Sequence, residues 1–373
     1  MQSGMGEDWL SGNYRLVPET DFNIAGFHCG NFSNLCTDSQ SFADCIALQR
    51  GDSGKTFAFM QWYMDNMKSD KLKFWLLENV EHFSRGKPLQ QAQAAMAARG
   101  FQLPRWGIFA ARNYSSDNNA RQRFYGPFAR NTIAVDPAMW DAACAAMQFR
   151  QGETVPLSAH ILPVAAVEWH PWLTHEQMRR GKRPRFAKSE HAKAMKLYQG
   201  MGMEYDMQRG APFLETLSMA SFPDMPASTF LKLDLYDRRQ RELLWWKVNQ
   251  EKILCQAIEQ KGVKLLPLEK SWEFFNDIPV NKAPTLCGSS SHLVCDFTHD
   301  KGPQMRPQLP EEGLSIQGAP AGDMWPNQSD FPAWLMSLGI TYAEMNHMIG
   351  MSFHINSFIA ALLATLLTLD RLD

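Results

Sequence analysis

Apolar and polar positions along the chain form short blocks that predict an α/β fold. Residues 22–27 and 74–77 have the length and the Ile, Phe, Trp and Leu content of buried strands. Residues 56–68 form an amphipathic run that predicts a crossover helix, and residues 88–99 form a second predicted helix. Residues 106–110 predict another strand. Strands that alternate with helices are typical of a mostly parallel sheet.

The second half of the chain has two helical patterns. Residues 237–260 predict one helix. Near the C-terminus, apolar residues recur with helical spacing and predict an amphipathic helix that docks on the sheet. These residues are Ile355, Phe358, Ile359, Leu362, Leu363, Leu366 and Leu367. The longest apolar stretch, 358–367, is shorter than the roughly 20 residues that span a bilayer. The first 20 residues are polar, so we expect a soluble protein with no membrane partner.

Two reactive residues directly follow the predicted strands. Cys29 comes after the first strand, and Glu78 comes after the second. Ligands in open α/β sheets bind beyond the carboxyl ends of the strands, so a thiol and a carboxylate placed in this way are predicted to face one pocket. Taken singly, a cysteine after a strand is usually a small buried apolar residue, and a glutamate there is usually solvated.

Five groups of residues give the chain a resemblance to the DNA (cytosine-5) methyltransferase family. Gly26-Phe27-His28-Cys29 resembles the catalytic G-F-P-C loop, with His for Pro, and Glu78-Asn79-Val80 matches the E-N-V tripeptide. Asn119-x-Arg121-x-Arg123 resembles Q-x-R-x-R, although a basic surface turn is the alternative interpretation. Residues 309–320 and 349–352 are similar to the C-terminal elements of the family.

The resemblance implies a Rossmann-like, mostly parallel methyltransferase sheet and a smaller target-recognition domain. The catalytic domain would comprise residues 1–150 plus 325–373, and the target-recognition and DNA-binding region would comprise 151–324. The nearest match to the glycine turn that binds the family's cofactor is Ser3-Gly4-Met5-Gly6, and two βα units expected between this turn and Cys29 are lacking. We therefore expect an N-terminally truncated sheet and an incomplete cofactor site.

The implied activity is methylation of cytosine C5 in double-stranded DNA, with S-adenosyl-L-methionine as cofactor. The Cys29 thiolate would add to C6 of a flipped base, while Glu78 would act as a carboxylic acid at N3. Arg123 would hold O2, and Arg121 would support the active-site loop. Two alternatives stay open: a catalytically silent relative that only binds DNA, and an RNA cytosine-5 methyltransferase of the same fold.

Further positions are implied as ligand contacts. The cofactor would contact Gly26, Gly350 and Ser352. The net charge is only −2, but residues 179–196 contain eight Lys or Arg and one Glu, a local charge of +7. A run of this kind is either a solvated surface or a phosphate-binding patch, and the resemblance favours the patch. The predicted nucleic-acid contacts are Ser33, Asn119, Arg179, Arg180, Lys182 and Arg183.

The cysteines bear on the compartment and on metal binding. The chain has seven, scattered and without a C-x-x-C pair, which indicates a reducing compartment rather than a disulfide framework. Their spacing matches no common zinc pattern, so no metal is expected. The expected location is the nucleus in a eukaryote and the cytoplasm otherwise.

Overall fold

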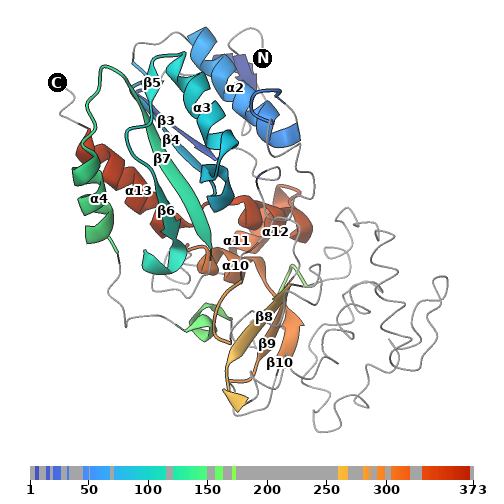
Figure 1. Ribbon diagram of the computed structural model, residues 1–373. Helices are drawn as coiled ribbons and strands as arrows, with labels where there is room; N and C mark the ends of the chain where they lie inside the picture. The colour runs from blue at the N-terminus through green and yellow to red at the C-terminus, as the bar shows by residue number, and fades with distance from the viewer. Residues whose placement is uncertain are drawn as a thin grey trace, which may run out of the picture. The chain divides into compact units, whose positions relative to one another are not determined.

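The computed structural model (Figure 1) describes residues 5–7, 14–16, 20–26, 32, 45–49, 51–67, 71–114, 121–148, 156–162, 170–173, 259–267, 280–284, 286, 292–298, 304–319 and 330–369. Several predicted features lie outside these residues. They are Cys29, Ser33, Asn119, the basic segment 179–196 and all but the end of the predicted helix 237–260.

The chain divides into two compact units. Unit 1 comprises residues 1–115, 121–153 and 353–373, and unit 2 comprises 116–120 and 154–352. The sequence interpretation placed the domain borders at 150 and 325. The helices between 330 and 351 belong to unit 2 because Leu335, Tyr342 and Ile349 share a core with its strands. The roles assigned to the two domains stay predictions.

A five-stranded sheet forms the centre of unit 1. Its strands are β3 (Phe22–Gly26), β4 (Phe74–Val80), β5 (Phe101–Gln102), β6 (Gly107–Ala110) and β7 (Gln122–Arg130). The order is β3-β4-β7-β5, and β6 pairs with β7 beside β5. β3 and β4 are parallel neighbours, whereas β7 is antiparallel to β4, β5 and β6. Four strands therefore run in one direction and only β7 opposes them, which confirms the predicted α/β, Rossmann-like class.

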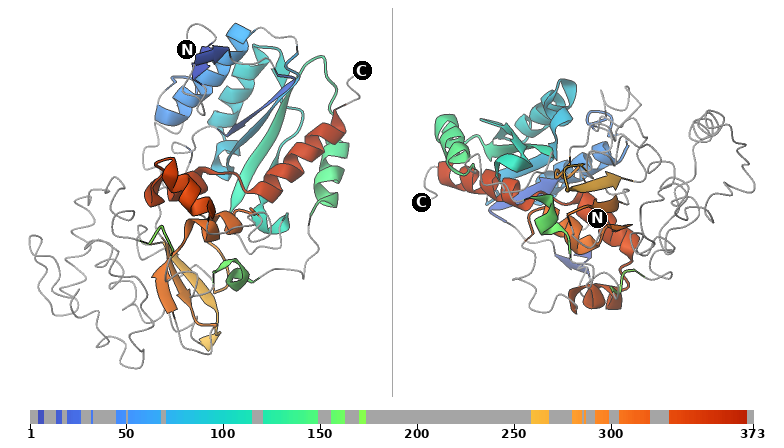
Figure 2. Two further views of the ribbon diagram at one scale, coloured as in Figure 1. Left: turned by 180° about the vertical axis from the view of Figure 1, so that it is seen from behind. Right: turned by 90° about the horizontal axis from the view of Figure 1, so that it is seen from below.

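Helices cover both faces of this sheet (Figures 1 and 2). The crossover helix α2 (Gly51–Met67) and α3 (Lys87–Ala97) pack on the face that carries Trp75 and Leu77. α4 (Pro137–Ala146) and α13 (Ile355–Thr368) pack on the face that carries Phe74 and Leu76. Alternate residues of β4 are thus buried on opposite sides, as expected of a strand inside a covered sheet.

The remaining described elements of unit 1 are short. β1 (Met5–Glu7) and β2 (Tyr14–Leu16) pair with each other in an antiparallel manner. The 3₁₀ helices η2 (Glu81–Ser84) and η3 (Ala111–Asn113) follow β4 and β6. β3 has a partner on one side only within the described residues, and its Phe22 and Ile24 are 41% and 38% exposed.

The C-terminal helix forms as predicted, but it docks through a different face. Small residues face the sheet and α4, and they are Ser357, Ala360, Ala361, Ala364, Thr365 and Thr368. The Trp140 indole Nε1 of α4 donates to Thr365 Oγ1 at 3.4 Å. The large apolar residues Ile359, Leu363, Leu366 and Leu367 are instead 41–65% exposed. Small side chains allow α13 to approach its neighbours closely. The expectation that the large apolar residues dock was therefore wrong for these four of the seven.

Unit 2 contains an antiparallel sheet next to a helical layer. The strands β8 (Val263–Pro267), β9 (His292–Asp296) and β10 (Gln304–Pro307) have the order β10-β9-β8. The helices are η4 (Leu157–His160), α10 (Pro310–Ile316), α11 (Asp330–Ser337) and α12 (Tyr342–Met351). Val263, Leu265 and Val294 from the strands meet Ile316 and Met345 from the helices in one core.

One segment, Tyr342–Thr368, is long and apolar enough to cross a membrane, with a mean hydropathy of 1.6. In the structure it is two helices, α12 and α13, separated by extended backbone at Ser352 and His354. α13 packs against α4 in the core of unit 1. The core of a folded protein therefore accounts for much of this apolar composition.

Candidate active site

Three of the predicted site residues that the structure describes, Gly26, Glu78 and Arg123, lie on three neighbouring strands at one face of the sheet. Gly26 at the end of β3 stands opposite Glu78 of β4, and Glu78 stands opposite Tyr125 of β7. Arg123 stands opposite Val80 and therefore shares this face, because residues two positions apart on a strand point to the same side. The face is the one that α13 covers.

Glu78 and Arg123 form a buried ion pair. Arg123 Nε lies 3.1 Å from Glu78 Oε1, and the side chains are 7% and 9% exposed. The contact lacks the geometry of a hydrogen bond, so these two atoms have no hydrogen-bond partner among the described residues. Buried polar atoms are normally bonded. An acceptor and a donor left open side by side are suited to a ligand that offers both kinds of group.

Tyr125 adds a neutral donor to the same face. Its hydroxyl lies 3.3 Å from Ser357 Oγ in the first turn of α13. Burial raises the pKa of Tyr125 well above its usual value, and the nearby Glu78 charge raises it further, while the bond to Ser357 and the charges of Arg121 and Arg123 act against this. The phenol therefore stays protonated at neutral pH.

Arg121 directly precedes β7 and is 2% exposed. Its backbone carbonyl accepts a hydrogen bond from Ala111 N at 2.8 Å, which ties the start of β7 to the end of β6. The second predicted arginine is thus held inside the protein near Tyr125 and not in a solvated turn. The interpretation of residues 119–123 as a surface turn is wrong for Arg121 and Arg123.

Phe353 closes the site from the side of α13. A Cβ built on Gly26 would lie 2.6 Å from Phe353 Cε1, 2.9 Å from its Cζ and 3.1 Å from Glu78 Oε2. The Gly26 backbone is exposed elsewhere, but the direction in which a side chain would point is filled by the ring. Only glycine fits at position 26, because the Phe353 ring lies where any other side chain would begin.

The predicted cofactor contacts are divided between the two units, with Gly26 in unit 1 and Gly350 and Ser352 in unit 2. The space beside Gly26 is filled by Phe353. Gly350 and Ser352 lie at the end of α12 in unit 2, where the Ser352 hydroxyl donates to Ile349 O at 2.7 Å. The cofactor role of these three residues stays a prediction.

The described parts of the chain contain no group of three or more His, Cys, Asp or Glu residues that would hold a metal ion. Their cysteines, Cys45, Cys144 and Cys295, are free and buried. Burial raises the pKa of the Cys144 thiol to about 12, and burial also raises that of Cys295. Thiols of this kind are poor nucleophiles at neutral pH.

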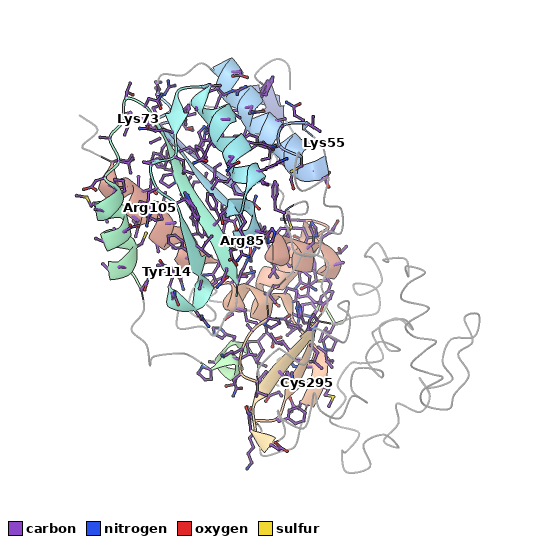
Figure 3. All side chains as sticks on the ribbon, in the orientation of Figure 1. Lys55, Lys73, Arg85, Arg105, Tyr114 and Cys295 are labelled. Atoms are coloured by element: carbon purple, nitrogen blue, oxygen red, sulfur yellow. The ribbon has the colours of Figure 1, made fainter. Side chains whose placement is uncertain are left out.

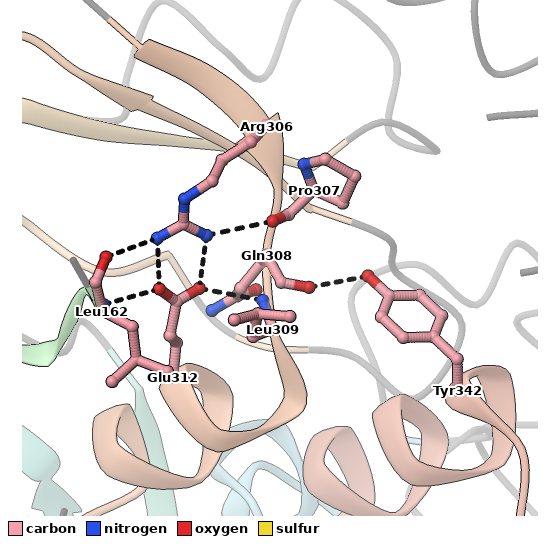
Figure 4. A network of polar contacts seen from close by, with 7 residues as sticks. All are labelled: Leu162, Arg306, Pro307, Gln308, Leu309, Glu312 and Tyr342. Carbon is pink, nitrogen blue, oxygen red and sulfur yellow. Dashed lines mark hydrogen bonds and ion pairs between the residues drawn. The ribbon is translucent and has the colours of Figure 1, made fainter. Parts of the chain in front are cut away.

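A second buried ion pair, in unit 2, involves the segment that resembles a C-terminal family element. Arg306 of β10 and Glu312 of α10 bind each other through both nitrogens and both oxygens (Figure 4). The carboxylate also accepts from Leu162 N and Leu309 N at 2.8 Å each. The guanidinium donates to Pro307 O and Leu162 O at 3.1 Å each. The motif here joins a strand, a helix N-terminus and a connecting segment.

A buried histidine and glutamate adjoin this pair. His170 Nε2 lies 3.6 Å from Glu311 Oε1, which also accepts from Trp172 Nε1 at 3.1 Å. Burial raises the pKa of Glu311 to about 7. Burial lowers the pKa of His170 to about 4, and the positive charge of Arg306 contributes to this. Both groups are largely uncharged at slightly acidic pH.

Sequence reasoning missed Tyr125 and Phe353. Tyr125 stands two positions after Arg123, so strand alternation would have placed it on the same face once β7 was recognised. Phe353 is adjacent to the segment 349–352 that resembles the family, but no pattern in the sequence indicates that its ring lies against Gly26.

Comparisons with known proteins give remote likenesses. No protein-family model matches the chain, and no curated protein matches it. A Dnmt2 methyltransferase of S. pombe is 12% identical, with a TM-score of 0.42 over 93% of this chain and 77% of that chain. The Entamoeba histolytica methyltransferase EhMeth is 11% identical, with a TM-score of 0.41 over 92% and 75%. A putative DNA modification methyltransferase from an E. coli prophage is 12% identical, with a TM-score of 0.41 over 93% and 79%. Likenesses of this extent establish neither family nor activity.

Proposed function

We propose that this protein is a cytosine-5 methyltransferase that acts on double-stranded DNA. One observation carries the proposal: the buried Glu78–Arg123 pair, with an open acceptor and an open donor, stands in register with Gly26. Cytosine offers O2 as an acceptor to the arginine, and its N3, once protonated during addition of the thiolate, donates to the carboxylate. The basic segment 179–196 supports a nucleic-acid substrate.

Cys29 is the proposed nucleophile. It follows Gly26 by three residues, and three residues of extended chain reach at most about 11 Å. The cysteines that the structure describes are buried, and the pKa values of Cys144 and Cys295 are raised, which removes these two as competitors. Cations such as Arg121 and Arg123 favour the thiolate form of a nearby cysteine.

The proposed chemistry begins with addition to the base. The Cys29 thiolate forms a bond to C6, the electron pair of the C5–C6 double bond moves into the ring, and the Glu78 carboxyl group gives its proton to N3. Arg123 holds O2, and C5 becomes an enamine-like nucleophile. S-adenosylmethionine would supply the methyl group in the reaction that the resemblance implies, with S-adenosylhomocysteine as the leaving group. After methylation, N3 returns its proton to the Glu78 carboxylate and the C5 proton is lost to solvent water. The electron pair of the C5–H bond then restores the C5–C6 double bond as the thiolate leaves.

Trapping with 5-fluorocytosine tests the nucleophile. Fluorine cannot leave C5 as a proton does, so DNA that contains this base should form a denaturation-stable adduct when the cofactor is added. Cys29→Ser should abolish the adduct, whereas Cys36→Ser, a substitution seven positions later, should retain it. If Cys29→Ser trapped DNA as well as the parent protein, the proposal would be wrong. The same trapping experiment with RNA of the same sequence shows whether DNA or RNA is the substrate.

One observation favours a second candidate, a relative that binds DNA without methylating it. The Phe353 ring fills the space beside Gly26 that the resemblance assigns to the cofactor. A silent relative would still bind DNA, but it would give no adduct with 5-fluorocytosine under any condition.

A further inference from the structure

The space beside Gly26 and the Glu78 carboxylate is filled by a side chain that belongs to neither strand. Phe353 Cε1 and Cζ lie 2.6 and 2.9 Å from the position of a Gly26 Cβ, and Glu78 Oε2 lies 3.1 Å from the same point. The ring and the carboxylate therefore flank the same point beside the end of β3. Any group of a ligand that approaches Gly26 from this side must displace it.

The ring is held by the first turn of α13. It stacks on Phe358 with the ring centroids 4.9 Å apart and an interplanar angle of 11°. His354, the next residue, caps the helix by accepting Ser357 N at its Nδ1 atom. The Ser357 hydroxyl in turn donates to His354 O and meets the Tyr125 hydroxyl. Contacts on the helix side therefore fix the ring position, while Gly26 provides only room.

The backbone around Phe353 is suited to movement. Ser352 is the last residue of unit 2 and Phe353 the first of this part of unit 1. Ser352 and His354 have extended backbone, with φ and ψ of −69° and 159° and of −76° and 112°. Rotation about the φ and ψ angles of Phe353 alone leaves intact the bonds from Ser352 N to Ile349 O and from Phe358 N to His354 O. Hinges are commonly a few residues at the ends of helices that absorb a change in φ and ψ.

We propose that Phe353 is a gate that determines which ligands reach Gly26 and Glu78. With the ring in place, the side of Gly26 is closed, and with the ring displaced, a cradle opens for the methyl donor. The identity of this ligand as S-adenosylmethionine rests on the proposed function. If the open state is populated at about 10% or less, the apparent affinity is reduced about tenfold or more, since only the open fraction binds.

Titration calorimetry with S-adenosylmethionine on the full chain tests the gate. Phe353→Ala should bind about tenfold more tightly than the parent protein. Phe22→Ala is the matched control, because it removes an exposed ring from the same face of β3 without touching Gly26, and it should bind as the parent does. Equal affinity of the parent and Phe353→Ala, or no binding by either, overturns the gate.

A double-mutant cycle on thermal unfolding tests the contact without any ligand. Gly26→Ala should lower the melting temperature of the parent, because its Cβ meets the ring, and should lower that of Phe353→Ala much less. Additive effects would overturn the contact on which the gate depends.

Exchange of the C5 hydrogen of cytosine with water, measured without the methyl donor, reports activation of the base alone. If Phe353→Ala binds S-adenosylmethionine more tightly but no C5 hydrogen exchanges, the gate is supported and the proposed function is wrong. If the C5 hydrogen exchanges but the affinity of Phe353→Ala is unchanged, the proposed function is supported and the gate is wrong.

Discussion

Among the residues that the structure describes, each unit contains one buried Arg–Glu pair, and the two pairs differ in how fully they are hydrogen-bonded. In unit 2, Arg306 and Glu312 bind each other twice and also bind four backbone groups. In unit 1, Arg123 Nε and Glu78 Oε1 lie 3.1 Å apart. Among the described residues, neither of these two atoms has a hydrogen-bond partner.

The difference separates a pair that holds the fold from one that is available to a ligand. A fully bonded buried network makes its surroundings rigid, whereas open buried polar atoms are a cost that a protein retains mainly at functional sites. Replacement of both partners by apolar residues distinguishes the two cases. At the Arg306–Glu312 pair, the replacement also leaves backbone groups without their partners. At the Glu78–Arg123 pair, only the contact between the two side chains is lost.

The largest effect is expected from Arg306→Met/Glu312→Leu. The N–H groups of Leu162 and Leu309 and the carbonyls of Leu162 and Pro307 would be left without these partners. At about 1 kcal/mol or more for each buried group, unit 2 should lose at least about 4 kcal/mol. Urea unfolding followed by hydrogen exchange in β8–β10 measures the loss.

A surface pair provides the control for this replacement. Arg105, labelled in Figure 3, binds Asp141 at 2.8 Å, and both side chains are 47% exposed. Arg105→Met/Asp141→Leu should therefore change stability by less than about 1 kcal/mol. A loss at the Arg306–Glu312 pair no larger than this control would show that the network does not hold unit 2 together.

The second-largest effect on stability is expected from the titration of Glu311 and His170, which lie beside the Arg306–Glu312 pair. The pKa of Glu311 in the folded protein is about 7 against an ordinary 4.5, so its contribution is full below pH 4.5 and is lost as pH rises through 7. The pKa of His170 is about 4 against 6.5, so its contribution is lost as pH falls from 6.5 through 4. Each departure corresponds to about 3 kcal/mol, and the two oppose each other in this range.

Single substitutions should reveal the two opposing trends. His170→Gln removes one titration, so the melting temperature of this variant should rise as pH falls from 7 to 4.5. Glu311→Gln should show the opposite trend, and the parent should vary least of the three. Parallel curves for all three proteins would mean that the two groups do not titrate as their burial indicates.

Much of unit 1 follows from local sequence pattern, and what does not follow has identifiable causes. The strands at 22–27 and 74–77 and their neighbouring positions were predictable, because continuous apolar runs mark strands. The prediction that both are buried holds for β4 and was wrong for β3, whose Phe22 and Ile24 are 41% and 38% exposed. β7 was not, since Gly126 and Pro127 interrupt its pattern and Pro is uncommon in central strands. The docked face of α13 was missed because its Ala, Ser and Thr residues give a weaker signal than its Leu residues.

The candidate site was predictable in its polar residues and not in its enclosure. Glu78 and Arg123 come together because β4 and β7 are neighbours in register, a relation that motif order indicates only indirectly. The contact of Phe353 with Gly26 joins residues 327 positions apart (353 minus 26), and it depends on where α13 begins. Long-range packing of this kind has no periodic signature in the sequence.

The smallest stability effect is expected at the Glu78–Arg123 pair itself. Its contact lacks hydrogen-bond geometry, and apolar replacement of a buried pair is often neutral or stabilising. Glu78→Leu/Arg123→Met should therefore stay within about 1 kcal/mol of the parent or be more stable, while it loses the adduct with 5-fluorocytosine. Hydrogen exchange in β4 and β7 measures the stability, and a loss near that of the unit 2 variant would mark this pair as a structural one.

Glu78→Leu alone should be less stable than the double variant, because it leaves Arg123 buried without its counter-charge. The difference in the free energy of unfolding between the single and the double variant thus measures the cost of one unpaired buried charge. The difference between the double variant and the parent measures what the pair itself contributes to the fold.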